Sequence, residues 1–147
     1  MASVQEVAST LRLKLPVLHA SNERDFDTVF ASLAQLQAGG LVAGAHVFFN
    51  SRSEQLATLA LRHAVPMITP YREFAAAGGL MSYGQSIPDQ YRQAGIYVGR
   101  ILKGEKPSDL PVQQATKVDL IINIKTATTL GVTFPLSLLG RADEVIE

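Results

Sequence analysis

The chain contains no cysteine in its 147 residues. Disulfides, thiolate catalysis and zinc sites with cysteine ligands are therefore excluded. The absence does not indicate a cellular compartment, because a chain without thiols tolerates both oxidising and reducing surroundings.

Neither sign of charge is in excess, since 13 Lys and Arg residues balance 13 Asp and Glu residues. A nucleic-acid-binding protein normally carries a basic patch, and so does a protein that binds an anionic membrane surface. We therefore expect no nucleic-acid partner.

Long hydrophobic runs are also missing. The longest mostly apolar run, residues 39–49, is too short to span a bilayer. Residues 1–21 lack a charged region followed by an apolar one, so no secretory signal peptide is predicted. As written, the sequence predicts a cytoplasmic chain.

The motifs of common enzyme classes are absent. There is no G-x-G-x-x-G and no G-x-x-x-x-G-K-[ST], and "GLMSYG" has the wrong spacing for a nucleophile elbow. His19, His46 and His63 share no metal-ligand spacing. We expect no enzyme activity, no cofactor and no metal site.

What the sequence does contain is an alternation of helical and strand patterns. Predicted helices cover residues 2–13, 22–40, 50–63 and 86–103, and predicted buried strands cover 15–20, 41–49, 64–70 and 78–84. A further strand begins at 117 and leads into a short helix ending at Gly131. The tail, 132–147, is predicted to hold one helical turn and a last short strand.

Helix boundaries have their own signals. Ser3 with Glu6 and Ser51 with Glu54 have capping-box spacing. Ser86 precedes a first helical turn that contains Pro88, and Gly104 follows the end of that helix.

This order predicts an α/β fold with a doubly wound parallel sheet, a three-layer αβα arrangement of the Rossmann-like or flavodoxin-like kind. The pattern opens on a helix, whereas such domains usually open on a strand. We therefore expect the first strand of the domain to be missing.

Ligands of open parallel sheets bind beyond the carboxyl ends of the strands. Polar and aromatic residues stand at the predicted strand ends, so we predict that one binding site is formed by Asn50, Ser51, Arg52, Tyr71, Ser82 and Tyr83. The alternative for Asn50 and Ser51 is helix capping, and for Tyr71 it is packing. Arg52 stands in the first turn of a predicted helix, where a cation is unfavourable, which favours an anionic partner; the alternative is a solvated side chain.

The chain also resembles a known family. The segment "GGLMSYG", the stretch from "YRQAGIYVGRILKG" to "INIKTATTLG", and "LLGRADEVIE" are similar to the C-terminal half of bacterial ABC-transporter substrate-binding proteins of the tryptophan-transport type. The resemblance implies one lobe of a type I periplasmic-binding fold. It divides the chain into a second-lobe core (1–84), a crossover helix (85–106) and a return segment (107–147).

The resemblance carries a function with it. Such proteins close two lobes around a small solute, often an amino acid, and deliver it to an ABC permease in the periplasm. The resemblance also implies hinge roles for Gly79 and Gly84, because glycine allows changes of the backbone angle φ. An intracellular sensory or regulatory domain of the same fold is the alternative. Because half of the cleft would be absent, weak ligand binding is expected.

The helix at 86–103 suggests a protein partner. It carries a broad apolar face formed by Tyr91, Ala94, Val98, Ile101 and Leu102. Such patches rarely stay uncovered on a monomer. We expect a homodimer, formed by packing of this helix or by exchange of segments.

Overall fold

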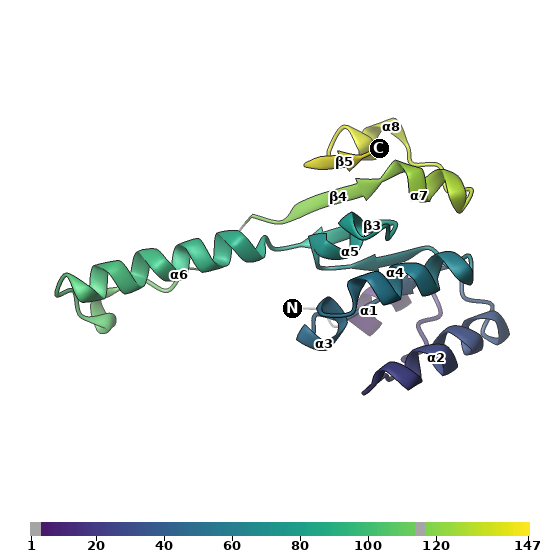
Figure 1. Cartoon of the computed structure of the whole chain (residues 1–147), viewed down its shortest axis with the longest axis horizontal. Coiled ribbons are helices and arrows are strands. Elements are labelled where there is room, and N and C mark those ends of the chain that lie inside the picture. The colour runs from purple at the N-terminus through teal and green to yellow at the C-terminus, as the bar shows by residue number, and fades with distance from the viewer. Residues whose placement is uncertain (1–3, 114–116) are drawn as a thin grey trace. The chain divides into compact units, whose positions relative to one another are not determined.

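A computed structural model describes residues 4–113 and 117–147 of the chain (Figure 1). The chain divides into two compact units, Met1–Leu36 and Gln37–Glu147. Each unit is described separately below. The capping box predicted at Ser3 lies outside the described residues.

In residues 4–36 the first unit holds two helices, α1 (Val4–Thr10) and α2 (Glu23–Gln35), both at predicted positions. Asn22 caps α2 by accepting a hydrogen bond from the Arg24 backbone N–H, and the Asp25 carboxylate accepts one from the Asn22 N–H. The hydrogen bonds from the Ser21 and Asn22 N–H groups lower the pKa of Asp25. Phe26, Phe30 and Leu33 form the buried face of α2, as the sequence periodicity indicates.

The strand predicted at residues 15–20 is not formed, so this prediction is wrong. A strand is stabilised by hydrogen bonds to a neighbouring strand, and the sheet of this structure contains no strand from this segment. Pro16 also lacks the backbone donor that a central strand needs. The apolar side chains of Leu15 and Val17 are consequently exposed.

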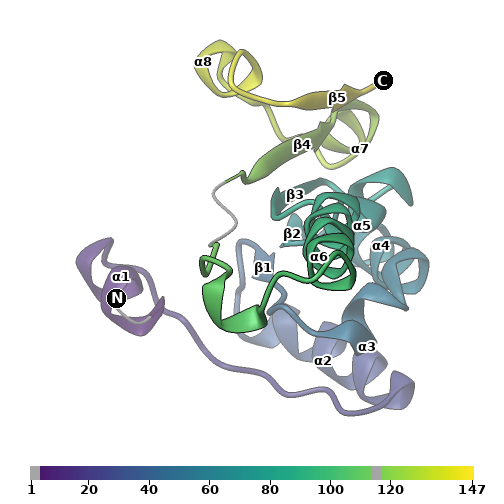
Figure 2. The same cartoon turned by 90° about the vertical axis from the view of Figure 1, so that its left-hand side faces the viewer.

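The second unit is built on a five-stranded sheet whose strands follow chain order, β1-β2-β3-β4-β5 (Figure 2). The strands are β1 (Leu41–Val42), β2 (Met67–Thr69), β3 (Met81–Gly84), β4 (Asp119–Asn123) and β5 (Glu144–Ile146). The β1–β2, β2–β3 and β4–β5 pairs are parallel, and the β3–β4 pair is antiparallel. The predicted α/β class is confirmed, with one antiparallel junction in the sheet.

Helices connect these strands. They are α3 (Val47–Asn50), α4 (Ser53–Arg62), α5 (Arg72–Ala76), α6 (Ile87–Leu102), α7 (Ile124–Thr129) and α8 (Leu136–Leu139), with a short 3₁₀ turn at Pro107–Asp109. α4, α6 and α7 match their predictions, as do the final helical turn and the last strand. α5 was not predicted.

The strand predicted at 41–49 is correct only at its start, because residues 47–50 form α3. The imidazole Nδ1 of His46 accepts a hydrogen bond from the Phe48 backbone N–H at 3.2 Å and so caps this helix. The sequence places His46 within an apolar run, which predicts a packed core histidine; that prediction is wrong, because His46 is an exposed capping residue.

The core of the second unit lies between the sheet and the helices α4 and α5. Phe74, Ala75 and Ile122 are completely buried, and Met67 is nearly so. The buried face of α4 adds Leu56, Ala57, Leu59 and Ala60. This core fixes α4 and α5 beside each other at the sheet.

Between β3 and β4 the chain leaves the sheet to form α6 (Figure 1). Ser86 caps α6 by accepting a hydrogen bond from the Asp89 N–H, and Gly104 follows it at φ +102°, as predicted. No residue of α6 is buried. The sequence divides the chain at 84/85 and 106/107 into a second-lobe core, a crossover helix and a return segment. Both boundaries fall within the second unit, so this three-part division remains a prediction.

Candidate functional site

The carboxyl ends of three parallel strands share one edge of the sheet. β1 is in register with β2 through Leu41 and Met67, and β2 with β3 through Ile68 and Met81. Arg52 follows β1 through α3, and Tyr71 follows β2 directly. The predicted residues therefore come from strands that end on the same side of the sheet, where α/β proteins bind ligands.

Asn50 and Ser51 lie where α3 gives way to α4. The Ser51 hydroxyl donates to the Phe48 carbonyl at 2.9 Å, and the Ser53 hydroxyl donates to the Asn50 carbonyl at 2.8 Å. The capping box predicted for Ser51 and Glu54 is not formed, because Arg52 occupies the N-cap position of α4 without a side-chain cap. Capping of α4 therefore does not explain these two residues.

The Asn50 side chain has an unusual environment. Its Oδ1 atom is buried and has no hydrogen-bond partner among the described residues. A buried acceptor without a donor costs free energy, about 1–3 kcal/mol. A polar atom kept in this state is suited to a donor supplied by a buried water.

The other predicted residues differ in how accessible they are. Tyr71 is half-buried at the N-cap of α5, with its backbone N–H donating to Thr69 Oγ1 at 3.2 Å. Tyr83 is 58% exposed, whereas Ser82 is 1% exposed between Thr69 of β2 and Ile121 of β4. A ligand would meet Tyr83 but would not reach the Ser82 side chain in this structure.

The two predicted hinge glycines have a packing role. A Cβ on Gly79 would lie 2.2 Å from the Phe74 ring, and a Cβ on Gly84 would lie 2.1 Å from the Pro70 carbonyl oxygen. Neither residue has a positive φ, which occurs instead at Gly78. Close approach accounts for both glycines, and their hinge role remains a prediction.

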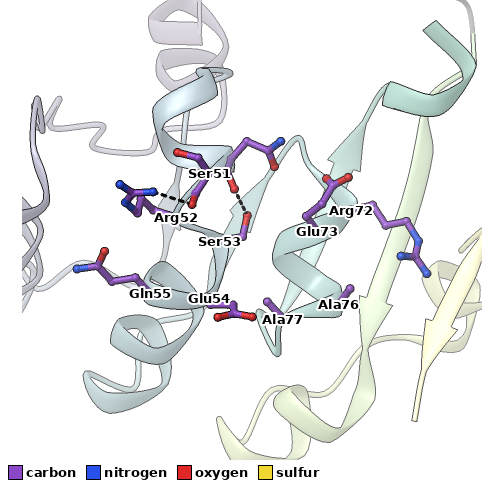
Figure 3. Close-up of a pocket in the computed structure, with 10 residues that line it drawn as sticks. Ser51, Arg52, Ser53, Glu54, Gln55, Arg72, Glu73, Ala76 and Ala77 are labelled. Atoms are coloured by element: carbon purple, nitrogen blue, oxygen red, sulfur yellow. Dashed lines mark hydrogen bonds between the residues drawn. The ribbon is translucent and has the colours of Figure 1, made fainter. Parts of the chain in front are cut away.

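A pocket of about 600 Å³ opens between α4 and α5 (Figure 3). Residues 50–55 form one wall, and Arg72, Glu73, Ala76 and Ala77 form the other. The pocket therefore brings together three predicted site residues, Asn50, Ser51 and Arg52. It does not include Tyr71, Ser82 or Tyr83.

Sequence reasoning missed the second wall of this pocket. The reason is that α5 is only five residues long and gives no helical periodicity. Arg72 donates two hydrogen bonds to the Glu144 carboxylate of β5, at 2.8 and 2.6 Å. These bonds and the charge of Glu144 raise the pKa of Arg72. The guanidinium of Arg72 is thus held at β5.

Two kinds of site are not found in the described part of the chain. Residues 4–113 and 117–147 contain no group of three or more His, Asp or Glu side chains placed to hold a metal ion. Within the same ranges no helix is long and apolar enough to cross a membrane.

Comparisons with known proteins add to this geometry. A structure of a conserved domain protein from Vibrio cholerae matches with a TM-score of 0.85 and 26% identity, over 97% of this chain and 48% of that one. The ABC domain from Streptococcus pneumonia in complex with L-Trp matches with a TM-score of 0.81 and 22% identity, over 95% and 48% of the two chains.

A third structure is the ligand-free, open form of a substrate binding protein with adhesive properties from Clostridium difficile. It matches with a TM-score of 0.67 and 21% identity, over 97% and 48% of the two chains. The chain thus spans about half the length of these structures. No curated protein sequence matches this chain.

The family described as ABC transporter substrate binding protein matches residues 1–146. Because this match covers almost the whole sequence, the chain belongs to the family of ABC transporter substrate-binding proteins.

Proposed function

We propose that the chain is part of the solute-binding component of an ABC uptake transporter. It forms one lobe of a type I periplasmic-binding fold and acts without enzyme chemistry. The observation that carries the proposal is the match to the family over residues 1–146. The polar residues that follow the parallel strands β1 and β2 support it, because they lie at the sheet edge where such folds bind ligands.

The solute we propose is an amino acid. The support is the similar fold of the ABC domain from Streptococcus pneumonia, which was solved with L-Trp. The solute would lie between this lobe and a second lobe, and closure would shift the population towards the form that the permease recognises. We propose that a protein containing this chain and a second lobe acts in the periplasm.

Binding by the chain alone is expected to be weak. One lobe covers only one side of a solute, whereas small-molecule sites usually enclose most of the ligand surface. We expect a dissociation constant for free amino acids no better than about 1 mM. Titration calorimetry of the chain with the common amino acids measures this. Micromolar binding by a monomeric chain would contradict the one-lobe interpretation.

The direct test of the proposed function uses a protein that contains this chain together with a second lobe. We expect that protein to bind an amino acid at least about 100-fold more tightly than the chain alone, because the second lobe completes the enclosure. Calorimetry of the two proteins with the same amino acids gives the comparison. Equal affinities, or no amino-acid binding by the longer protein, would overturn the proposal.

We further propose that the isolated chain forms a homodimer through α6, by packing of this helix or by exchange of segments. The predicted apolar face of α6 is exposed at Tyr91 (76%), Val98 (54%), Ile101 (39%) and Leu102 (83%), and Ile96 of the same helix is 44% exposed. Light scattering at micromolar concentration is expected to give twice the chain mass. Replacing Val98 with aspartate is expected to give a monomer, because it places a charge in the apolar face. A parent chain that is monomeric would refute the dimer.

A further inference from the structure

The segment 131–147 lies at one edge of the sheet without entering the core. It carries α8 and β5, and none of its residues, all of which the structure describes, is buried. β5 is the outermost strand and pairs with β4 (Figure 1). β4, in contrast, is buried from Leu120 to Asn123. The segment therefore covers an edge of the sheet, while its side chains bury little apolar surface to hold it there.

Main-chain hydrogen bonds hold this segment at β4. The β4–β5 pairing extends over only the three residues of β5. Just before β5, the Asp143 N–H donates to the Leu120 carbonyl at 2.8 Å, and the Leu120 N–H donates to the Asp143 carboxylate at 2.8 Å. A strand pair this short has little stability of its own. Contacts outside the strand pair therefore matter for keeping β5 in place.

One such contact joins β5 to α5, 72 positions away in the sequence. Arg72 donates from Nε to Glu144 Oε2 at 2.8 Å and from Nη2 to Glu144 Oε1 at 2.6 Å. Figure 3 shows the Arg72 side chain extending from α5 on the side away from α4. The α5 end of this ion pair is fixed, because Phe74 and Ala75 of the same helix are completely buried.

The local surroundings of Arg72 do not explain why an arginine occurs there. Arg72 is the first residue of α5, where a positive charge interacts unfavourably with the helix dipole. Packing does not explain it either, since 56% of its side chain is exposed. The Glu144 carboxylate supplies a reason, because its two oxygens match the planar guanidinium in a two-point contact.

We propose that residues 131–147 form a strap that opens and closes on the sheet while the core stays folded, and that the Arg72–Glu144 pair is the latch that keeps it closed. In the open form β4 becomes an edge strand whose main-chain groups no longer pair with β5. The Arg72 guanidinium, at the wall of the pocket between α4 and α5, then loses its partner. The latch thus connects the last strand to the pocket wall. The inference is independent of the proposed function, because it concerns motions of this chain alone.

The test of the strap is amide hydrogen exchange of the chain, followed by NMR at increasing but sub-denaturing urea. We expect the protected amides of residues 143–146 to exchange at least about 10-fold faster than those of β2 and β3. Their exchange should depend little on urea, because local opening exposes little surface. If residues 143–146 have the exchange rate and urea dependence of β3, global unfolding alone releases them and the strap is refuted.

Substitutions test the latch. Glu144→Gln and Arg72→Gln each remove one charge, and each is expected to speed exchange at residues 143–146 about 2- to 5-fold, the range for an exposed ion pair. Arg100→Gln is the matched control. Arg100 and Glu105 form a similarly exposed pair with bonds of 2.6–3.0 Å, but both residues belong to α6 and the turn after it. This control should leave exchange at residues 143–146 unchanged, and an equal acceleration by all three variants would overturn the latch.

The double variant separates the ion pair from other effects of the two side chains. If the latch is the interaction itself, Arg72→Gln combined with Glu144→Gln should speed exchange no more than either single substitution. Two factors that multiply would assign the effects to the separate side chains. Equal acceleration of the β2, β3 and β5 amides in the single variants would show that the pair stabilises the whole fold and not the strap.

Salt tests the latch without a substitution in the parent chain. Raising NaCl to about 0.5 M screens an exposed ion pair. Exchange at residues 143–146 should therefore accelerate about 2- to 5-fold in the parent and stay constant in the Glu144→Gln variant. The same response to salt in both proteins would show that the Arg72–Glu144 pair does not keep the strap closed.

Discussion

Replacing Gly84 with alanine is expected to lower the free energy of unfolding by about 3 kcal/mol or more, the upper range for overpacking a close contact. The added Cβ would lie 2.1 Å from the Pro70 carbonyl oxygen and 2.8 Å from the Pro70 Cα. Both atoms belong to the backbone between β2 and α5, so they cannot move aside as a flexible side chain would. Urea denaturation followed by circular dichroism measures the loss.

Gly95→Ala provides the matched control. Gly95 lies inside α6, and no atom lies within 4 Å of the position its Cβ would take. Alanine is a better helix former than glycine, so this variant should be more stable by about 1 kcal/mol. The same substitution is thus expected to have opposite effects at the two positions.

The Gly84→Ala and Gly95→Ala variants together also test why glycine occurs at the end of β3. If Gly84 served only to make a hinge flexible, alanine would stabilise the folded state by reducing the entropy of the unfolded chain. If the close approach to Pro70 requires glycine, alanine destabilises it. A Gly84→Ala variant as stable as the parent would show that the backbone near Pro70 gives way, and it would leave flexibility as the reason for the glycine.

The sequence predicts those elements whose pattern is both long and local. α2, α4 and α6 have ten or more residues, and their apolar spacing and end signals are visible in the sequence. α5 has five residues, and the four residues of α3 lie within an apolar run that is also typical of a strand. Neither is long enough to show helical periodicity.

The strand predicted at 15–20 failed for a different reason. An apolar run shows that a segment could pair, but whether it does depends on a neighbouring strand supplied by another part of the chain. The segment forms no strand, and Leu15 and Val17 are exposed.

The candidate site was predictable only in part. Parallel strands bring their carboxyl ends to one edge, which was sufficient to select Asn50, Ser51 and Arg52, three residues that line the pocket. Tyr71 was selected by the same argument and does not line it. The contribution of Glu73 could not be predicted, since it depends on α5 packing beside α4. The burial of Ser82 likewise depends on β4, which follows it by more than thirty residues.

The buried side chain of Asn123 connects three elements of the second unit. It stands at the end of β4 and is 5% exposed. Its Oδ1 accepts a hydrogen bond from the Thr126 N–H at 3.0 Å and so caps α7. Its Nδ2 donates to the Ala75 carbonyl of α5 at 3.1 Å. Removing this side chain would leave α7 uncapped and take one of two donors from the Ala75 carbonyl, which also accepts a hydrogen bond from the Gly78 N–H at 3.2 Å.

We expect Asn123→Ala to lower the free energy of unfolding by about 1–2 kcal/mol, the sum of a lost helix cap and one lost buried hydrogen bond. Thr128→Ala is the control, since the Thr128 hydroxyl donates to the Ile124 carbonyl at an exposed position of the same helix and its loss should change stability by less than about 0.5 kcal/mol. Urea denaturation of the parent and the two variants gives the comparison.

Because Ala75 belongs to α5, the Asn123→Ala variant should also loosen the α5 wall of the pocket, seen as faster amide hydrogen exchange at residues 75–77. Equal stability of the two variants would show that the contact between Asn123 and Ala75 does not hold α5 against β4.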